Sequence, residues 1–287
     1  MNVPPAIEES IFSSRLVRLG EHHCHDQYPD GPSVAVTEHT VIFPLASGRI
    51  VHDGVAAFEL PTTVTLQNAG EVVRREGSHH AWMTADTALL AEILGGDVRR
   101  PFPTDHIALD ASLSVRQRAL FHFARRFGEA DPLTVEGESI GIIEEIGAKI
   151  RAPRAIPTAC PVVERARALL ATEFATTISL AQLAQQVGVS SAYLSRAFRA
   201  ATGETLHAFR EDLRLRRSLD LLPDSRGDFT RVALELGYSS HSHFSSRFRR
   251  HFGITPTEFV ERTYGAGFRG VDVTRRIAAD DGRCVCT

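Results

Sequence analysis

The chain has 287 residues, of which 43% are hydrophobic and 23% charged, and its formal net charge is −3. These values are typical of a soluble globular protein that is long enough for two domains. No run of about 18 apolar residues is present, which argues against a membrane-spanning helix. Residues 1–10 also lack the apolar segment of a secretory signal, so we expect a cytoplasmic protein with no membrane partner.

Cysteine usage and charge distribution narrow the class of protein further. The cysteines are scattered, at Cys24, Cys160, Cys284 and Cys286. They form no disulfide framework and are expected to be thiols in a reducing compartment.

Residues 160–264 carry 14 Arg against 11 Asp and Glu, a net charge of +3, whereas the rest of the chain is acidic. This asymmetry permits nucleic-acid binding without requiring it.

Short β-type runs separated by turn residues mark the first part of the chain. They cover residues 33–37, 40–43, 62–66 and 71–74. Closely spaced runs with Gly, Asp and Asn at the bends predict a small β-barrel or a β-sandwich, and periodicity does not choose between the two.

Three predicted helices follow, over residues 84–94, 112–127 and 134–150. An apolar face on each of the last two is expected to pack in the core, or, alternatively, to form a dimer interface as well. Three prolines between Arg151 and Pro161 then predict an extended linker. The expected organisation is a sensing and dimerisation domain over 1–150, a linker over 151–161, a helical domain over 162–264, and a tail over 265–287 that need not be ordered.

The helical domain repeats itself at a period of about fifty residues. In each copy a Ser or Asp caps a helix, a small Ala lets two helices approach closely, and a Gly takes the left-handed turn between them. These residues are Ser179, Ala184 and Gly188 in the first copy and Asp228, Ala233 and Gly237 in the second. A second helix then buries apolar residues spaced four apart and exposes a polar face with Arg. Two such units in register, joined by a helix over 206–222, predict paired DNA-binding helix-turn-helix units rather than an ordinary helical bundle.

Several motifs in this domain are specific. They are Tyr193-Leu-Ser-Arg-Ala-Phe198, Gly203-Glu-Thr205, Arg214-Leu-Arg216, Leu221-Leu222, Gly237-Tyr238, His243-Phe244 and Gly253-Ile-Thr-Pro-Thr-Glu-Phe259. Through them, residues 162–262 resemble the C-terminal domain of AraC/XylS-type regulators, and the first domain resembles, less specifically, their cupin-like effector domains. The resemblance implies a two-domain α+β fold, with an N-terminal cupin-like β-barrel plus helices and a C-terminal all-α domain with two helix-turn-helix units.

The resemblance also implies a function. Two recognition helices would enter successive major grooves of double-stranded promoter DNA, in a sequence-specific transcriptional regulator whose N-terminal domain senses a small effector or a partner. It allows RNA polymerase and a second copy of the chain as further partners. No cofactor is expected, and the absence of a supported catalytic motif argues against an enzyme.

The residues expected to contact DNA lie on the polar faces of the two recognition helices. They are Ser191, Ala192, Tyr193, Ser195, Arg196 and Arg199 in the first, and His241, Ser242, Ser245, Ser246, Arg247 and Arg249 in the second. Arg196 is the one long bidentate donor at a base-facing position and is expected to read guanine. The family commonly has arginine where this chain has Ser246. We therefore expect the second helix to read bases weakly, or the neighbouring Arg247 to contact a phosphate.

The run Glu21-His-His-Cys-His25 is the other chemically suggestive segment. Imidazole and thiolate groups from His22, His23, Cys24 and His25 can bind zinc, copper or nickel, which makes a metal- or redox-responsive regulator the alternative function. Alternation along a strand would place His23 and His25 on one face and the other two on the opposite face. Because no second Cys/His group stands at a zinc-site spacing, a solvated histidine-rich strand end is the favoured interpretation.

Overall fold

A computed structural model of the chain describes residues 7–23, 33–52, 54–76, 79–126, 131–152, 160–175 and 178–264. The strands are β1 (Ile7–Ser13), β2 (Val17–His23), β3 (Val34–Ala35), β4 (Thr40–Pro44), β5 (Gly48–His52), β6 (Val55–Glu59), β7 (Thr63–Gln67), β8 (Val72–Glu76), β9 (His79–Ala85) and β10 (His106–Ala108). The helices are α1 (Thr87–Leu94), α2 (Ala111–Arg126), α3 (Pro132–Arg151), α4 (Pro161–Glu173), α5 (Leu180–Gln186), α6 (Ser191–Thr202), α7 (Leu206–Asp224), α8 (Phe229–Glu235), α9 (His241–Phe252) and α10 (Pro256–Tyr264). No helix in these ranges combines the length and the apolar character needed to cross a membrane.

Two antiparallel sheets build the first half of the molecule. One has the order β1-β2-β9-β4-β7-β10 and the other the order β3-β8-β5-β6. The predicted α+β class is confirmed, but among the described strands none pairs from one sheet to the other, so the β part is not a closed barrel. The strands β1, β2, β5, β6, β9 and β10 lie outside the runs predicted from the sequence.

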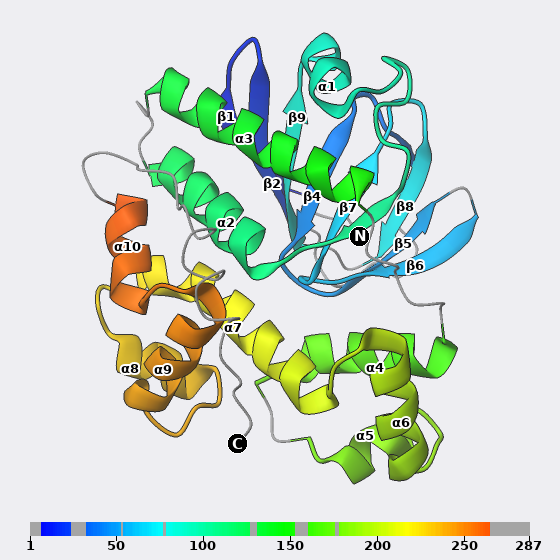
Figure 1. The fold of residues 1–287 in the computed structure, drawn as a ribbon, viewed down its shortest axis with the longest axis vertical. Coiled ribbons are helices and arrows are strands. Elements are labelled where there is room, and N and C mark those ends of the chain that lie inside the picture. The colour runs from blue at the N-terminus through cyan, green and yellow to red at the C-terminus, as the bar shows by residue number, and fades with distance from the viewer. Residues whose placement is uncertain are drawn as a thin grey trace, which may run out of the picture.

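Alternation along the strands decides which side chains of the six-stranded sheet meet the helices. Val41, Phe43, Val64, Leu66 and Met83 are at most 2% exposed and share one apolar core with residues of α2 and α3, which lie over this face of the sheet (Figure 1). The odd and even positions of one strand point to opposite faces. The neighbours of these residues therefore face away from the helices.

The first predicted helix begins three residues later than expected. Thr84 belongs to β9, and α1 starts at Thr87. The Asp86 carboxylate accepts hydrogen bonds from the backbone N–H groups of Ala88 and Leu89, at 3.0 and 3.1 Å. Aspartate is a strong N-cap residue, so this position, rather than Thr84, starts the helix.

The helix α2 is buried on two sides, which the prediction of a single apolar face missed. Leu120 contributes to the core beneath the sheet, whereas Val115 and Ala119 contribute to the core of the second helical unit. Only Arg125 and Arg126 of this helix are exposed. A broad free face for a dimer interface is therefore not present on α2.

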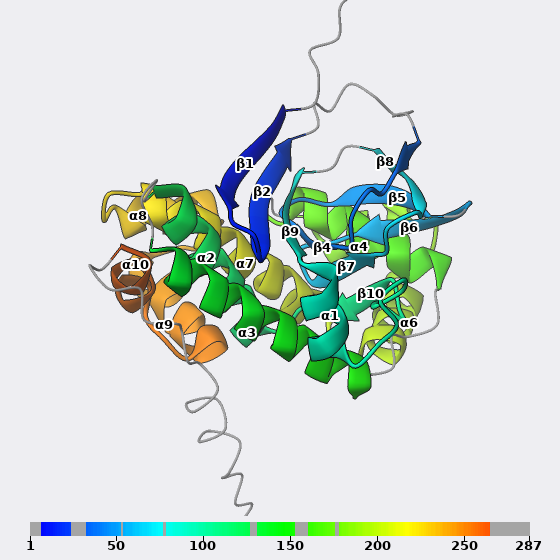
Figure 2. The same cartoon turned by 90° about the horizontal axis from the view of Figure 1, so that it is seen from above.

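The helix α7 carries one helical unit at each end (Figure 1). Its residues Phe209 and Leu213 join the core formed with α4, α5 and α6, and its residues Leu219 and Leu222 join the core formed with α8, α9 and α10. Figure 2 shows α2 running between α3 and α7.

Most of the predicted linker, residues 153–159, and the tail beyond Tyr264 lie outside the described residues.

Candidate nucleic-acid interface

The two helix-turn-helix units have the same turn. In the first, Gly188 follows α5 with a φ of 77°, and the Val189 N–H donates to the Ala184 carbonyl at 3.0 Å. In the second, Gly237 follows α8 with a φ of 80°, and the next residue donates to the Ala233 carbonyl at 2.9 Å. A positive φ is strained for residues with a Cβ, so glycine is favoured at both positions. The matching hydrogen bonds confirm that the sequence repeat is a structural repeat.

The second helix of each unit is capped by a serine. The Ser190 hydroxyl accepts from the Tyr193 N–H at 3.2 Å, at the start of α6. At the start of α9 the cap is Ser240, which accepts from the His243 N–H at the same distance. These two helices are the candidate recognition helices.

One face of each candidate recognition helix is fully buried. Leu194 and Phe198 of α6, and Phe244 and Phe248 of α9, each have 0% exposure. This burial fixes the rotation of each helix about its axis, so the opposite face is presented to solvent.

Most of the predicted DNA-contacting residues lie on these solvent faces. Ala192, Tyr193, Ser195, Arg196, Arg199, His241, Ser242, Ser246 and Arg249 are exposed, and Ser191, Ser245 and Arg247 are half-buried. Among the described residues, no hydrogen bond or ion pair holds the Arg196 guanidinium. Its donors are therefore free to meet a ligand.

The polar face of α9 is more engaged with the protein itself. The Arg247 Nε atom lies 3.6 Å from Glu211 of α7 and 3.4 Å from the His243 ring. His241 contacts the Ser245 hydroxyl at 3.0 Å, and its ring lies against that of Phe229. Arg247 is thus oriented toward α7 rather than away from it.

Arg216 of α7 ties the paired units to the first half of the molecule. Its guanidinium donates to the Ser114 hydroxyl at 2.9 Å and to the Leu109 carbonyl at 2.7 Å. It also donates to Asp212 at 2.9 Å, which His251 contacts at the same distance. Burial alone would raise the pKa of Asp212, but the Arg216 guanidinium, together with the contact from His251, outweighs it and lowers the pKa to about 2. Nothing in the sequence indicates that Arg216 reaches α2, because that contact joins positions about 100 residues apart.

The two described histidines of the histidine-rich run, His22 and His23, lie on opposite faces of the sheet. His22 stacks on His80 with a ring separation of 4.9 Å, while His23 lies against His79 at 4.0 Å, in agreement with the alternation expected for a strand. Cys24 and His25 lie outside the described residues. The pairing of β2 with β9 brings these histidines together. In the sequence, the only sign of this arrangement is a second pair of adjacent histidines, His79 and His80.

Comparison with known proteins agrees with this geometry. A family model described as a helix-turn-helix domain matches residues 183–262. The transcriptional regulator ArgR of Pseudomonas aeruginosa is 31% identical over 98 residues, which cover 34% of this chain and 30% of ArgR. The regulator RipA of Corynebacterium diphtheriae is 30% identical over 214 residues, which cover 72% of this chain and 58% of RipA. A solved AraC-type DNA-binding structure from Chromobacterium violaceum is 33% identical, with a TM-score of 0.35, and the match covers 37% of this chain and 96% of that one. The chain thus spans less than two thirds of either full-length relative.

Proposed function

We propose that the chain is a helix-turn-helix transcriptional regulator of the AraC/XylS type, as its similarity to such regulators supports, and that its paired units bind promoter DNA sequence-specifically. The observation that carries this proposal is the presence of two equivalent units, with the same turn and the same capping, at the two ends of α7. At 19 residues, this helix is about 28 Å long. That length is comparable to the roughly 34 Å between successive major grooves on one face of DNA.

We further propose that the two units contribute unequally. Arg196 is exposed and unpaired among the described side chains, so its fork can bind guanine O6 and N7. Ser246 offers only a short hydroxyl, and Arg247 is held near Glu211. The first unit would then read bases, supported by Tyr193 and Arg199, and the second would mainly position the protein through phosphate contacts.

DNase footprinting with the full chain on promoter fragments, in the presence of bulk competitor DNA, tests this function. We expect one protected window of about two helical turns and an affinity that falls steeply with salt, as phosphate contacts require. A protein that prefers no promoter fragment over competitor DNA would contradict the proposal.

We also propose that the N-terminal sheets bind a small polar effector between them. Four adjacent positions cross the six-stranded sheet in one row: Trp82 pairs with Ile42, Ile42 with Thr65, and Thr65 with His106. This row points away from the helices, because the neighbouring strand positions lie in the core beneath them. The Trp82 Nε1, Thr65 Oγ1 and His106 Nε2 atoms are buried and have no hydrogen-bond partner among the described residues.

The four-stranded sheet faces this row with charged groups. Arg75 of β8 and Glu59 of β6 form an ion pair at 3.1 Å, with 14% and 1% side-chain exposure. Burial lowers the pKa of His106, and the charge of Glu59 partly offsets that effect, as expected for groups on facing sheets. Buried polar atoms without partners are costly, so a bound polar molecule with donors and acceptors would stabilise this interior.

Tryptophan fluorescence can detect such binding, because Trp82 is the only tryptophan in the sequence and lies in this row. We expect saturable changes in tryptophan fluorescence with an effector drawn from small polar metabolites, and weaker binding after Thr65→Val. The matched control is Thr40→Val, on the half-exposed rim of the same sheet. Ligands that bind with equal affinity to both variants and the wild type would contradict a site between the sheets.

A further inference from the structure

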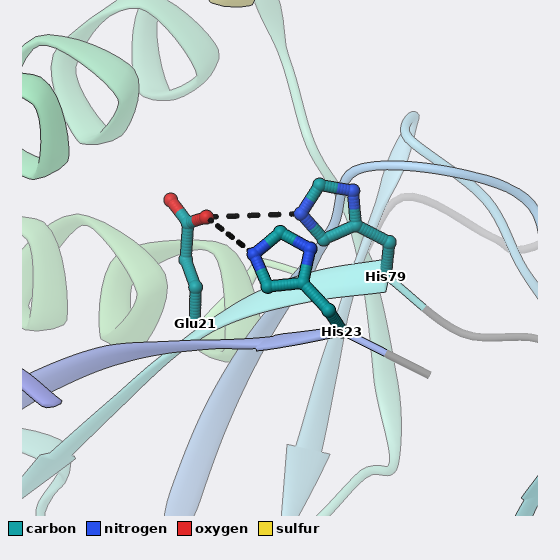
Figure 3. Close-up of side chains that lie close together, drawn as sticks. All are labelled: Glu21, His23 and His79. Atoms are coloured by element: carbon teal, nitrogen blue, oxygen red, sulfur yellow. Dashed lines mark ion pairs between the residues drawn. The ribbon is translucent and has the colours of Figure 1, made fainter. Parts of the chain in front are cut away.

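Glu21, His23 and His79 lie together at one end of the six-stranded sheet, outside the sites considered so far. Antiparallel pairing of β2 with β9 places His23 opposite His79, and Glu21 precedes His23 by two residues on the same face. The Glu21 Oε2 atom lies 3.6 Å from Nε2 of His23 and 3.7 Å from Nε2 of His79. Figure 3 shows both rings turning these nitrogens toward the carboxylate.

The spacing of these three donor atoms fits a metal ion better than it fits hydrogen bonds. Each imidazole contact to Glu21 is longer than an ordinary N–H···O hydrogen bond. The Nε2 atom of His79 is buried and has no hydrogen-bond partner among the described residues. Neighbouring ligand atoms around a tetrahedral zinc ion lie about 3.3 Å apart, and both distances from Glu21 to the imidazoles are within a few tenths of an ångström of that value. One ligand atom from each residue already lies within 4.8 Å of the other two.

A cation in this cluster would meet one carboxylate and two imidazoles, and Arg125 is the nearest competing positive charge. The Arg125 guanidinium of α2 is 2.6 Å from Glu21 Oε2. This is the same oxygen that both imidazoles face, so an ion would bind Oε2 with Arg125 displaced from it. Arg125 also lies 3.5 Å from the Glu9 carboxylate, which can hold it after that shift.

The cluster is open to solvent on one side. His23 and His79 line a cleft of about 620 Å³ between the sheet and the C-terminal helices. Arg216, Arg217 and Asp220 of α7 form part of its other wall. An ion can therefore enter from this cleft, and water or a carboxylate in it can supply a fourth ligand.

We infer that Glu21, His23 and His79 form a binding site for one divalent transition-metal ion of the zinc class. Two imidazoles and one carboxylate with an open fourth position are a ligand set that zinc, cobalt and nickel accept. This site differs from a cluster of His22 to His25, because it uses one histidine of that run and takes its other ligands from Glu21 and from β9. It does not depend on the proposed DNA-binding function.

Metal binding to the full chain tests this inference with Zn²⁺ and with Co²⁺ as a spectroscopic probe. After removal of metal with a chelator, we expect one equivalent of Zn²⁺ by calorimetry and visible absorption bands from bound Co²⁺. Changing an outer-shell partner of a metal ligand weakens binding by about 10- to 100-fold, so loss of a ligand in His23→Gln or His79→Gln should weaken it by more. The His23 side chain is 44% exposed, so its replacement should leave folding intact, which circular dichroism checks.

His22→Gln is the matched control, since it makes the same change at the adjacent residue on the opposite face of the sheet. It should retain one equivalent of Zn²⁺ with unchanged Co²⁺ bands. A wild-type protein that binds neither ion would overturn the site. So would binding that survives both His23→Gln and His79→Gln, because the ion would then be held by other residues.

Discussion

Replacing Arg216 with Met should destabilise the whole molecule and separate the unfolding of its two halves. Arg216 is 7% exposed and makes three kinds of contact: to Asp212 within α7, to the Ser114 hydroxyl and to the Leu109 carbonyl. Methionine keeps most of the apolar stem but removes every donor. The buried Asp212 carboxylate would then retain only its contact with the His251 ring, at 2.9 Å, among the contacts described above.

The expected loss follows from the burial of these groups. Breaking a buried ion pair by removing one partner costs about 3–5 kcal/mol, and the two bonds across the interface join groups that are buried in the folded state. We therefore expect Arg216→Met to lower the free energy of unfolding by about 3–5 kcal/mol, a large part of the roughly 5–15 kcal/mol typical of natural proteins. Arg217→Met is the control, because Arg217 is 38% exposed and pairs with Asp220 at 3.3 Å. A surface pair of this kind is worth about 0–1 kcal/mol.

Urea unfolding of the full chain gives the measurement. Far-ultraviolet circular dichroism follows mainly the helices, and fluorescence follows Trp82 in the sheet. We expect coincident transitions for the wild type and for Arg217→Met, and separated transitions for Arg216→Met, because the polar contacts that Arg216 makes with Ser114 and Leu109 have been lost while the apolar contacts of α7 with α2 remain. A loss below about 1 kcal/mol, or equal losses in the two variants, would refute this account of the interface.

Three further predictions concern stability and DNA binding. Since the pKa of Asp212 is about 2 in the folded protein and about 4 in an unfolded chain, its ionised form stabilises the fold above about pH 4. This contribution should disappear as the pH falls toward 2, and the stability of Asp212→Asn, measured by urea unfolding, should fall less over this range than that of the wild type. An added Cβ at Gly237 would lie 2.9 Å from a backbone carbonyl oxygen, whereas at Gly188 it meets nothing within 4 Å. Gly188→Ala should therefore lower the free energy of unfolding by about 1–2 kcal/mol from its positive φ alone, and Gly237→Ala by about 1–3 kcal/mol more. Equal losses in thermal unfolding would count against the packing described. Arg196→Ala should remove sequence preference, with a loss of about 1–3 kcal/mol in the free energy of binding to a preferred site. Ser246→Ala should change that binding free energy by less than about 0.5 kcal/mol. Equal losses, measured by fluorescence anisotropy, would show that the two units contribute alike.

The helical half could be predicted from the sequence because its signals are local. Ser179 and Asp228 cap helices that begin at the next residue, and Gly188 and Gly237 adopt the left-handed conformation that their positions required. Each of these features depends on residues within one or two turns of the chain. The solvent faces of α6 and α9 followed from the same periodicity.

The sheets and the histidine pairs could not be predicted in the same way, because they depend on strand register. His23 meets His79 only because β2 pairs with β9 in a register that joins residues 56 positions apart. Hydrophobic periodicity states which face of a strand is apolar, but not which strand lies beside it. The second buried side of α2 could not be predicted for a related reason. It packs in the core of the second helix-turn-helix unit, which lies about 100 residues further along the chain.

Selection of binding sites from a pool of random DNA duplexes by the full chain tests the central claim most directly. The account predicts enriched sequences with two segments about ten base pairs apart, one strongly constrained and containing a guanine that Arg196→Ala ceases to select, the other weakly constrained. A pool that shows no enrichment would contradict the claim of specific DNA binding. Two equally constrained segments would contradict the proposed division of labour between α6 and α9.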